Sequence, residues 1–254
     1  MLDTAIEAAC AAGRLVMEAY GDIETQQIDA KGQGDYVTYA DKAAEEVIVR
    51  TIKKIYPDNS FYGEEAGFQN SGSDYVWIID PIDGTTNFIQ GIPQFSISIA
   101  LMYKHTLQIG VVYDPLKKEL FRAEKGKGAF LNDRPIHVPQ LDDTRKAILT
   151  TGFPYRIHPH IDDFLQIFKA LFWVTGGIRR MGSAALDLAY TACGRFHGYF
   201  ELKLAPYDFA AGLLILEEAG GIFSDFQGTQ NCFETGNVIG GSKAVHELIL
   251  NITR

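Results

Sequence analysis

The stretch from Tyr75 to Phe95 constrains the fold of this chain more than any other. It opens with Tyr75–Ile79, a run of apolar, aromatic and partly β-branched residues that is typical of a strand buried on both faces. Asp80 and Asp83 follow, on either side of Pro81, which lacks an N–H donor and is expected to end the strand ladder between them. Carboxylates at the end of a buried strand need a partner that compensates for their lost hydration.

Gly84 allows a tight turn directly after these acids, and Thr85 and Thr86 can begin a short helix. Carboxylates bind hard divalent cations, and N–H groups at a helix start bind phosphate. The stretch therefore indicates a metal and phosphate site. On its own it also fits an acidic turn in which Asp83 serves only as a helix cap.

The length and net charge of the chain limit the classes of function that it can have. A chain of 254 residues suits one large domain or two fused subdomains. Its net charge of −9, without a Lys/Arg block, argues against a general nucleic-acid or anionic-membrane surface. A phosphate substrate would need metal ions at the site, because the overall charge repels it.

The remaining compositional signals predict a soluble cytoplasmic protein. Cys10, Cys193 and Cys232 lack metal-ligand spacing, which indicates reduced thiols. Residues 2–20 show helical spacing instead of a basic stretch followed by an apolar run. We therefore expect neither a membrane nor a nucleic-acid partner.

Apolar periodicity predicts helices and strands in mixed order, without a strict βαβ period. Helices are expected at about residues 2–20, 40–55, 161–172, 183–192 and 207–219, with a last helix capped by Ser242. Strands are expected near 61–62, 75–79, 95–101, 107–113, 119–123, 126–131, 147–150, 198–201, 221–226 and 237–239. This order predicts a layered α/β or α+β fold, with a second half that begins near Ala147.

Other acids also lie at the ends of predicted strands or the starts of predicted helices, as Asp80 and Asp83 do. Glu64 and Glu65 lie between glycines at a predicted strand end, where a solvated turn is the plain alternative. Asp41 fits a capping box with Thr38, and Asp208 lies in the first turn of a helix, where it complements the dipole. If such acids converge, they cannot all remain ionised without a counter-charge, and all-oxygen ligands favour Mg²⁺, Mn²⁺ or Ca²⁺.

Several blocks of the sequence together resemble the inositol monophosphatase family. They are Gly63–Glu65, Trp77–Phe88, Pro206–Gly212 and Glu218–Gly221, and their spacing agrees with that family over nearly the whole chain. The resemblance implies a layered αβαβα sandwich, usually a homodimer. It also implies a single domain over residues 1–254, with a metal-binding part at roughly 1–146 and a substrate-side part at 147–254. It also implies Mg²⁺-dependent hydrolysis of phosphomonoesters that lithium inhibits.

The resemblance also assigns metal and substrate roles, with two or three Mg²⁺ ions per subunit. One metal would be bound by Glu64, Asp80 and the Ile82 carbonyl, and a second by Asp80, Asp83 and Asp208. Glu64 would also help to hold a weaker third ion. The substrate pocket would be lined by Gly182, Ser183 and Ala184, with Glu201 binding substrate hydroxyl groups.

For catalysis, Thr85 would orient the attacking water while Asp41 accepts a hydrogen bond from the Thr85 hydroxyl. Glu65 would contact a metal-bound water. The N–H groups of Gly84 and Thr85 would hold the phosphate.

The chain departs from the family pattern at two places. Lys31 lies four residues before Asp35 instead of five, and Tyr207 replaces the usual tryptophan. Residues 151–173 are the least patterned and are expected to encode substrate choice. His158 and His160 lie there, either near the substrate or in a solvated loop.

Inositol monophosphate is the leading substrate, and fructose 1,6-bisphosphate, NADP and histidinol phosphate are alternatives. Phosphoadenosine phosphate ranks lower, because Thr86-Asn87-Phe88 replaces the Lys-Glu-Phe that is more common in its phosphatases. Two other classes remain: a non-catalytic partner-binding protein on this fold, and a structural Ca²⁺-binding module.

Overall fold

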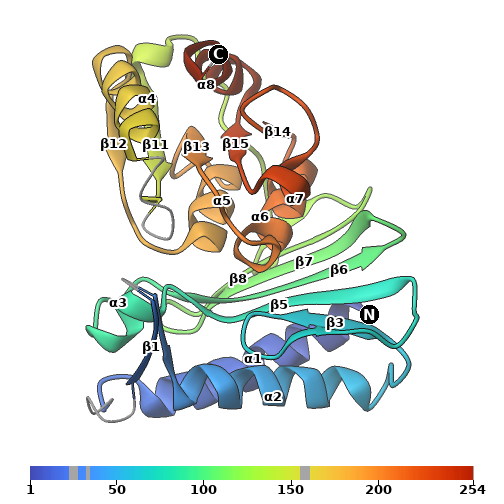
Figure 1. The fold of residues 1–254 in the computed structure, drawn as a ribbon. Coiled ribbons are helices and arrows are strands. Elements are labelled where there is room, and N and C mark those ends of the chain that lie inside the picture. The colour runs from blue at the N-terminus through green and yellow to red at the C-terminus, as the bar shows by residue number, and fades with distance from the viewer. Residues whose placement is uncertain (23–27, 33–34, 155–160, 254) are drawn as a thin grey trace.

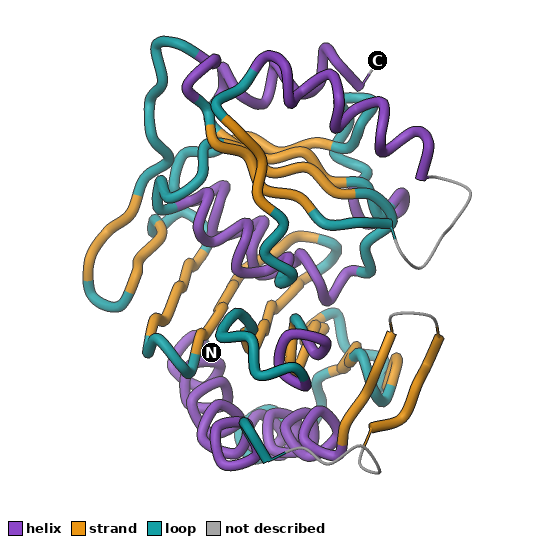
Figure 2. The backbone as a smooth tube through the Cα atoms, turned by 90° about the vertical axis from the view of Figure 1, so that its left-hand side faces the viewer, coloured by secondary structure: helices purple, strands orange, loops and turns teal. Residues whose placement is uncertain are grey.

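The computed structural model describes residues 1–22, 28–32, 35–154 and 161–253. Its elements stack in five layers: helices, a sheet, helices, a second sheet and helices (Figure 1). The view turned by 90° shows the same order (Figure 2). This is the predicted αβαβα sandwich. No helix among the described residues is long and apolar enough to cross a membrane.

The outer helical layer consists of α1 (Leu2–Ala19) and α2 (Tyr39–Lys53). Their contacting faces are rich in alanine, and Ala8, Ala12 and Ala44 are fully buried, so the two helices can pack closely. Thr38 and Asp41 form the predicted capping box at the start of α2. A short hairpin of β1 (Ile28–Gly32) and β2 (Asp35–Thr38) lies between the two helices in the chain.

The first sheet, here called the large sheet, has the strand order β10-β9-β8-β7-β6-β5-β3-β4. β3 and β5 are parallel, and the other pairs are antiparallel, so the predicted meander is confirmed. Its strands are β3 (Ser60–Gly63), β4 (Gly67–Gln69), β5 (Tyr75–Asp83), β6 (Ser96–Tyr103), β7 (Thr106–Asp114), β8 (Glu119–Glu124), β9 (Ala129–Leu131) and β10 (Arg134–Ile136). The short helix α3 (Thr85–Ile89) follows β5.

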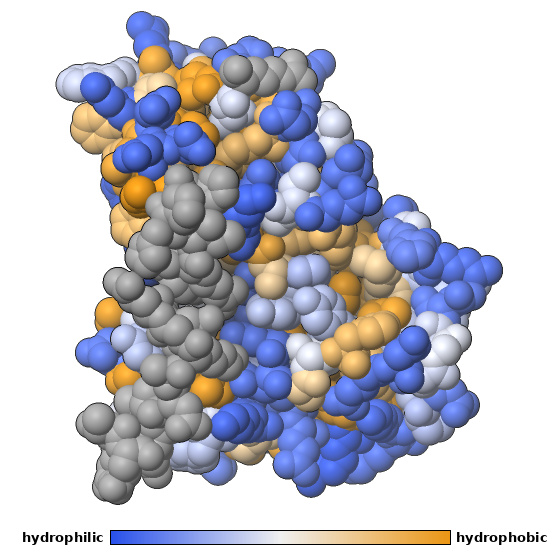
Figure 3. Space-filling model, viewed as in Figure 1, coloured by the Kyte–Doolittle hydropathy of each residue, from blue (hydrophilic) through white to orange (hydrophobic). Residues whose placement is uncertain are grey.

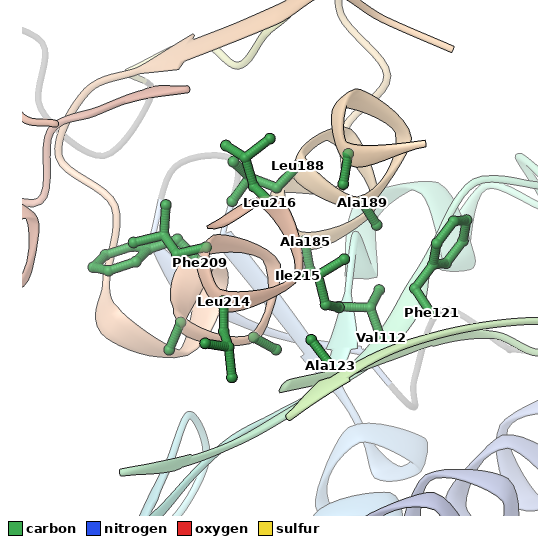
Figure 4. Close-up of a cluster of buried hydrophobic side chains, with 14 of the residues drawn as sticks. Val112, Phe121, Ala123, Ala185, Leu188, Ala189, Phe209, Leu214, Ile215 and Leu216 are labelled. Atoms are coloured by element: carbon green, nitrogen blue, oxygen red, sulfur yellow. The ribbon is translucent and has the colours of Figure 1, made fainter. Parts of the chain in front are cut away.

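The middle layer consists of α5 (Ala184–Ala192) and α6 (Pro206–Glu218). Figure 4 shows Leu188 of α5 and Ile215 of α6 in one cluster with Val112, Phe121 and Ala123 of the large sheet. Every residue of α5 is buried, because both faces of this layer are covered by a sheet. Such all-round apolar character is typical of a central helix.

The second sheet, here called the small sheet, has the strand order β12-β11-β13-β15-β14. Its strands are β11 (Ile148–Thr151), β12 (Gly177–Arg179), β13 (Gly198–Glu201), β14 (Ile222–Ser224) and β15 (Val238–Gly241). Its outer face is covered by α4 (Ile161–Val174) and α8 (Lys243–Thr253) (Figure 1). The segments η2 (Thr144–Lys146) and α7 (Cys232–Thr235) complete the second half.

Several sequence predictions about the second half were wrong. Apolar spacing predicts an inner face of α4 formed by Ile161, Phe164, Leu165, Phe168 and Phe172. Phe164 is buried as predicted, whereas Leu165 and Phe172 are 49% and 51% exposed. Apolar side chains therefore reach the surface over α4 (Figure 3). Ser242 does not cap α8 through its side chain, because its hydroxyl is buried without a hydrogen-bond partner in the described structure. The sequence analysis also missed β12 and α7.

Candidate active site

A cavity of about 370 Å³ opens where the ends of β5 and α3 meet the middle helical layer and the small sheet. Its lining includes eleven of the predicted site residues: Glu64, Asp80, Ile82, Asp83, Gly84, Thr85, Gly182, Ser183, Ala184, Glu201 and Asp208. Segments far apart in the sequence therefore converge at one place, as the sequence analysis expected.

The end of β5 delivers two acids to the cavity. Contrary to our expectation, Pro81 does not end the strand: β5 continues to Asp83, and its register against β6 shifts between Asp80 and Asp83. Such a bulge accommodates a residue that cannot donate to the ladder and redirects the neighbouring side chains. The Ile82 N–H donates to Asp80 Oδ1 at 3.1 Å, which fixes this turn of the chain.

Asp83 joins the large sheet to the start of α5. Its carboxylate accepts hydrogen bonds from the Ser183 hydroxyl at 2.6 Å, the Ala185 N–H at 2.7 Å and the Ala184 N–H at 3.2 Å. Burial raises the pKa of Asp83 to about 6, although these bonds lower it. The sequence also allowed Asp83 to serve only as a cap of the helix that follows it. Asp83 does cap a helix, but that helix is α5 and not the adjacent α3.

Asp80 lies among like charges. Burial raises its pKa well above the ordinary value, and the carboxylates of Glu64, Asp83 and Asp208 raise it further. Glu64 follows β3 and is held near β5 by the bond from its N–H to the Ile79 carbonyl, at 3.1 Å. The resulting arrangement calls for a positive counter-charge.

Thr85 and Asp41 form the predicted contact. The Thr85 hydroxyl lies 3.0 Å from Asp41 Oδ1 and 2.9 Å from the Ile82 carbonyl oxygen. The other oxygen of Asp41 accepts bonds from the Thr38 N–H and hydroxyl, at 2.8 and 2.6 Å. Burial raises the pKa of Asp41, while the bonds from Thr38 and Thr85 lower it. Asp41 therefore supports Thr85 from beneath the cavity.

Gly84 lies where the two halves of the chain meet. Its φ of 103° is in the left-handed region, and a Cβ there would approach the Gly182 carbonyl oxygen to 3.0 Å. Asn87 makes a second link, since its side-chain amide donates to the Met181 carbonyl at 2.8 Å and the Gln94 carbonyl at 2.7 Å. The close approach of Gly84 to Gly182 and the bond from Asn87 to Met181 hold the turn after β5 against the segment that precedes α5.

The remaining predicted residues lie on the second half of the chain. Asp208, in the first turn of α6, accepts a bond from the Ala205 N–H at 2.7 Å. Glu201, at the end of β13, accepts a bond from the Tyr199 hydroxyl at 2.7 Å. Each carboxylate is thus fixed by a neighbour in its own segment.

The sequence analysis missed several cavity residues, including Tyr36, Arg180, Asp187 and Lys203. A signal existed for Asp187, because it lies four residues after Ser183 and therefore shares a helix face with it. Burial raises the pKa of Asp187 well above its ordinary value.

Some predicted residues lie elsewhere. Glu65 lines a groove beside α2, outside the cavity lining, and its N–H donates to Glu45. His158, His160 and the side chain of Lys31 fall outside the described part of the structure.

Among the described residues, no three His, Cys, Asp or Glu side chains form a group that could hold a metal ion as they stand. The chemistry of the donors nevertheless fits Mg²⁺, which prefers oxygen ligands. The buried like charges around Asp80 are the feature that a cation would relieve.

Comparison with solved structures shows a phosphatase-type fold. The structure matches an inositol monophosphatase from Anabaena (Nostoc) sp. with a TM-score of 0.84 and 38% identity, over 99% of this chain and 94% of that one. It matches an IMPase from Thermotoga maritima with a TM-score of 0.91 and 35% identity, over 99% and 96% of the two chains. The model of the inositol monophosphatase family covers residues 1–254, and the chain belongs to that family.

Sequence relatives carry a different kind of name. The chain is 45% identical to the protein named Nus factor SuhB from Escherichia coli, over 98% of this chain and 94% of that protein. A protein of the same name from Pseudomonas aeruginosa is 43% identical over the same shares. The structure of extragenic suppressor protein suhB from Bartonella henselae matches with a TM-score of 0.96 and 38% identity, over 99% and 97% of the chains.

Proposed function

We propose that this protein hydrolyses a phosphomonoester with the help of Mg²⁺, and that inositol monophosphate is the first substrate to test. The observation that carries the proposal is the convergence of Glu64, Asp80, Asp83 and Asp208 on one cavity beside Thr85. The family to which the chain belongs supports the reaction class.

The family resemblance assigns the metal ligands among the oxygens that line the cavity. Glu64, Asp80 and the Ile82 carbonyl would hold one ion, and Asp83 and Asp208 would join Asp80 at a second. Glu64 would help to hold a weaker third ion. When bound, the ions would neutralise the carboxylates and the incoming phosphate dianion. A net charge of −9 makes such neutralisation necessary for an anionic substrate.

The residues of the chain would position the reactants. The Thr85 hydroxyl, which donates to Asp41 Oδ1 at 3.0 Å, would accept a hydrogen bond from the attacking water and so orient it. The N–H groups of Gly84 and Thr85 would donate to phosphate oxygens at the start of α3. Phosphoryl transfer requires mainly positioning and charge stabilisation, so no protein nucleophile is needed.

Residues from the second half of the chain would select the leaving group. Glu201 would accept bonds from substrate hydroxyls, and Gly182, Ser183 and Ala184 would line the substrate pocket. Fructose 1,6-bisphosphate, NADP and histidinol phosphate remain alternative substrates of the same chemistry.

Phosphate release from a panel of these esters, with and without Mg²⁺, tests the proposal. We expect Mg²⁺-dependent turnover, with the highest kcat/KM for a polyol phosphate. Absence of release from every ester at saturating Mg²⁺ would favour a non-catalytic role for the fold, and Ca²⁺ binding without turnover would favour a structural cation site.

A second candidate function is a Nus factor role, and it rests on the name of relatives that are 43–45% identical over 94% of their length. It would add a partner class that the charge argument did not predict. Complementation of a bacterial strain lacking its own Nus factor SuhB, by this chain and by its Asp83→Asn variant, separates the two functions. Complementation by both proteins would show a role that does not require turnover.

The family resemblance also predicts a homodimer and inhibition by lithium. Light scattering coupled to size-exclusion chromatography tests the first prediction. Titration of Li⁺ into the phosphate-release assay tests the second.

A further inference from the structure

Glu45 is a buried acid on the inner side of α2 that the proposed mechanism does not use. It is 4% exposed, although it lies on a helix that faces solvent on its other side. Its two carboxylate oxygens accept the backbone N–H groups of Glu65 and Ala66, each at 2.9 Å. Both donors belong to the turn that joins β3 to β4, and this turn carries Glu64.

The contact is tightly fitted. A Cβ added to Gly63 would approach the carboxylate carbon and both oxygens of Glu45 to 2.5 Å. The carboxylate therefore lies directly against the backbone that precedes Glu64. From the other side, the Glu64 N–H donates to the Ile79 carbonyl of β5 at 3.1 Å. Glu64 is thus held between α2 and β5.

A carboxylate is suited to this task because each oxygen accepts a hydrogen bond, and charge-assisted bonds are stronger than neutral ones. A glutamine has the same shape but one accepting oxygen, and its NH₂ group would face an N–H donor. The turn would then lose one of its two anchors. Outer groups that orient ligands in this way tune metal affinity.

We propose that Glu45 is a positioning residue for Glu64: it fixes the β3–β4 turn so that the Glu64 carboxylate faces the cavity at the place where Mg²⁺ would bind. The inference rests on the proposed function for the identity of the metal. It assigns a role in the site to a residue outside the cavity lining.

The test compares Glu45→Gln with Glu46→Gln in the full chain. Glu46 is the adjacent residue on α2, is exposed, and lines the same groove as Glu45, so it is a matched control for loss of one charge. Calorimetric titration of Mn²⁺ and Mg²⁺ reads out metal affinity without turnover. Phosphate release as a function of Mg²⁺ concentration reads out its catalytic consequence.

For Glu45→Gln we expect the metal dissociation constant to rise about tenfold, while Glu46→Gln binds as the wild type does. At saturating Mg²⁺, kcat should return to within about twofold of wild type, because the lost restraint acts on ligand placement and not on the reacting atoms. A lower melting temperature with unchanged metal affinity would show a purely structural role and overturn the inference.

Gly63→Ala provides an independent variant that leaves Glu45 in place and displaces its carboxylate through the added Cβ. It should raise the metal dissociation constant in the same direction, and it keeps the inference testable if Glu45→Gln does not fold. Unchanged affinity in Gly63→Ala would also count against the inference. Metal binding by a wild type that releases no phosphate would overturn the proposed function alone, whereas absence of metal binding would overturn both.

Discussion

Two buried aspartates, one at the cavity and one beside the small sheet, experience opposite environments. Asp80 and Asp225 are each 2% exposed. Burial raises the pKa of Asp80, and neighbouring carboxylates raise it further. Burial also acts to raise the pKa of Asp225, but hydrogen bonds from Thr229, Gln227 and Gly228 bring it below the ordinary value.

Both side chains are closed off from solvent, but Asp80 lies deeper in the protein than Asp225, and the neighbours of the two carboxylates differ. Asp225 accepts the Gln227 N–H, the Thr229 N–H and the Thr229 hydroxyl at 2.6–2.9 Å. Around Asp80 the chain instead places other acids. The protein can thus stabilise a buried carboxylate with hydrogen-bond donors alone, whereas the like charges around Asp80 support the proposed cation site.

The largest expected effect concerns Asp83. Asp83→Asn removes one charge from the cavity acids and should lower kcat/KM by about a hundredfold or more, because metal charge stabilises the transition state by several kcal/mol. The fold should remain, since the amide oxygen can still accept from the start of α5. Phosphate release and near-UV circular dichroism measure the two effects. Full Mg²⁺-dependent activity in this variant would contradict a catalytic role for the acids that line the cavity.

Thr85 tests whether the cavity acids act through a positioned hydroxyl. Thr85→Val keeps the shape but removes the contact with Asp41, and we expect turnover to fall about a hundredfold, the loss expected when a reactant is misplaced. Thr85→Ser is the matched control and should retain most activity. Equal activity of the serine and valine variants would exclude this role.

Substitution of each aspartate by asparagine tests the comparison of Asp80 with Asp225 through the free energy of unfolding. In metal-free protein, Asp225→Asn should destabilise the fold by about 1–3 kcal/mol, because an NH₂ group would face donors that the carboxylate satisfies. Asp80→Asn should instead be neutral or stabilising, because it removes a buried like charge. Urea unfolding in EDTA measures both. Equal losses of stability would show that the two aspartates have equivalent environments.

Glu201 tests the substrate end of the cavity. Glu201→Gln should raise KM about tenfold for a polyol phosphate, the range for a lost charge-assisted hydrogen bond, and leave KM for an aryl phosphate without hydroxyls nearly unchanged. Steady-state kinetics with both esters gives the answer. A parallel rise for the two substrates would argue for a structural role, such as its contact with the Tyr199 hydroxyl.

The smallest expected effect is a pH dependence of the folding stability, caused by His246 near Asp225. His246, whose Nε2 lies 2.8 Å from the Ser224 hydroxyl, has a pKa that burial lowers from 6.5, with Glu247 acting in the opposite direction. The unfolded chain then binds a proton more readily, so His246 should reduce stability as pH falls below 6.5. The stability difference between wild type and His246→Gln should shift against the wild type between pH 7.5 and 5.5. A pH-independent difference would contradict this.

The sequence predicted the first half of the fold well because its signals are local and strong. Alternation in β6, the capping box of Thr38 and Asp41, and the apolar run of β5 each depend on neighbours in the chain. The continuation of β5 through Pro81 could not be predicted from the sequence, because a bulge depends on how β5 pairs with β6.

In the second half, the inner face of α4 was misjudged because apolar side chains also occupy its exposed side, where Leu165, Phe172 and Trp173 reach the surface. Segments as short as β12 and α7 carry too few residues for a pattern. The metal-ligand candidates were found from motif blocks, whereas Arg180, Lys203 and the support from Glu45 depend on contacts between distant segments.

A crystal soaked in Mn²⁺ tests the central claim most directly, because the anomalous signal locates the ion without any assay. The account predicts manganese in the cavity, within about 2.2 Å of oxygens from Asp80, Asp83, Asp208 and Glu64. Manganese bound elsewhere, or a cavity whose carboxylates remain apart with no ion between them, would contradict it.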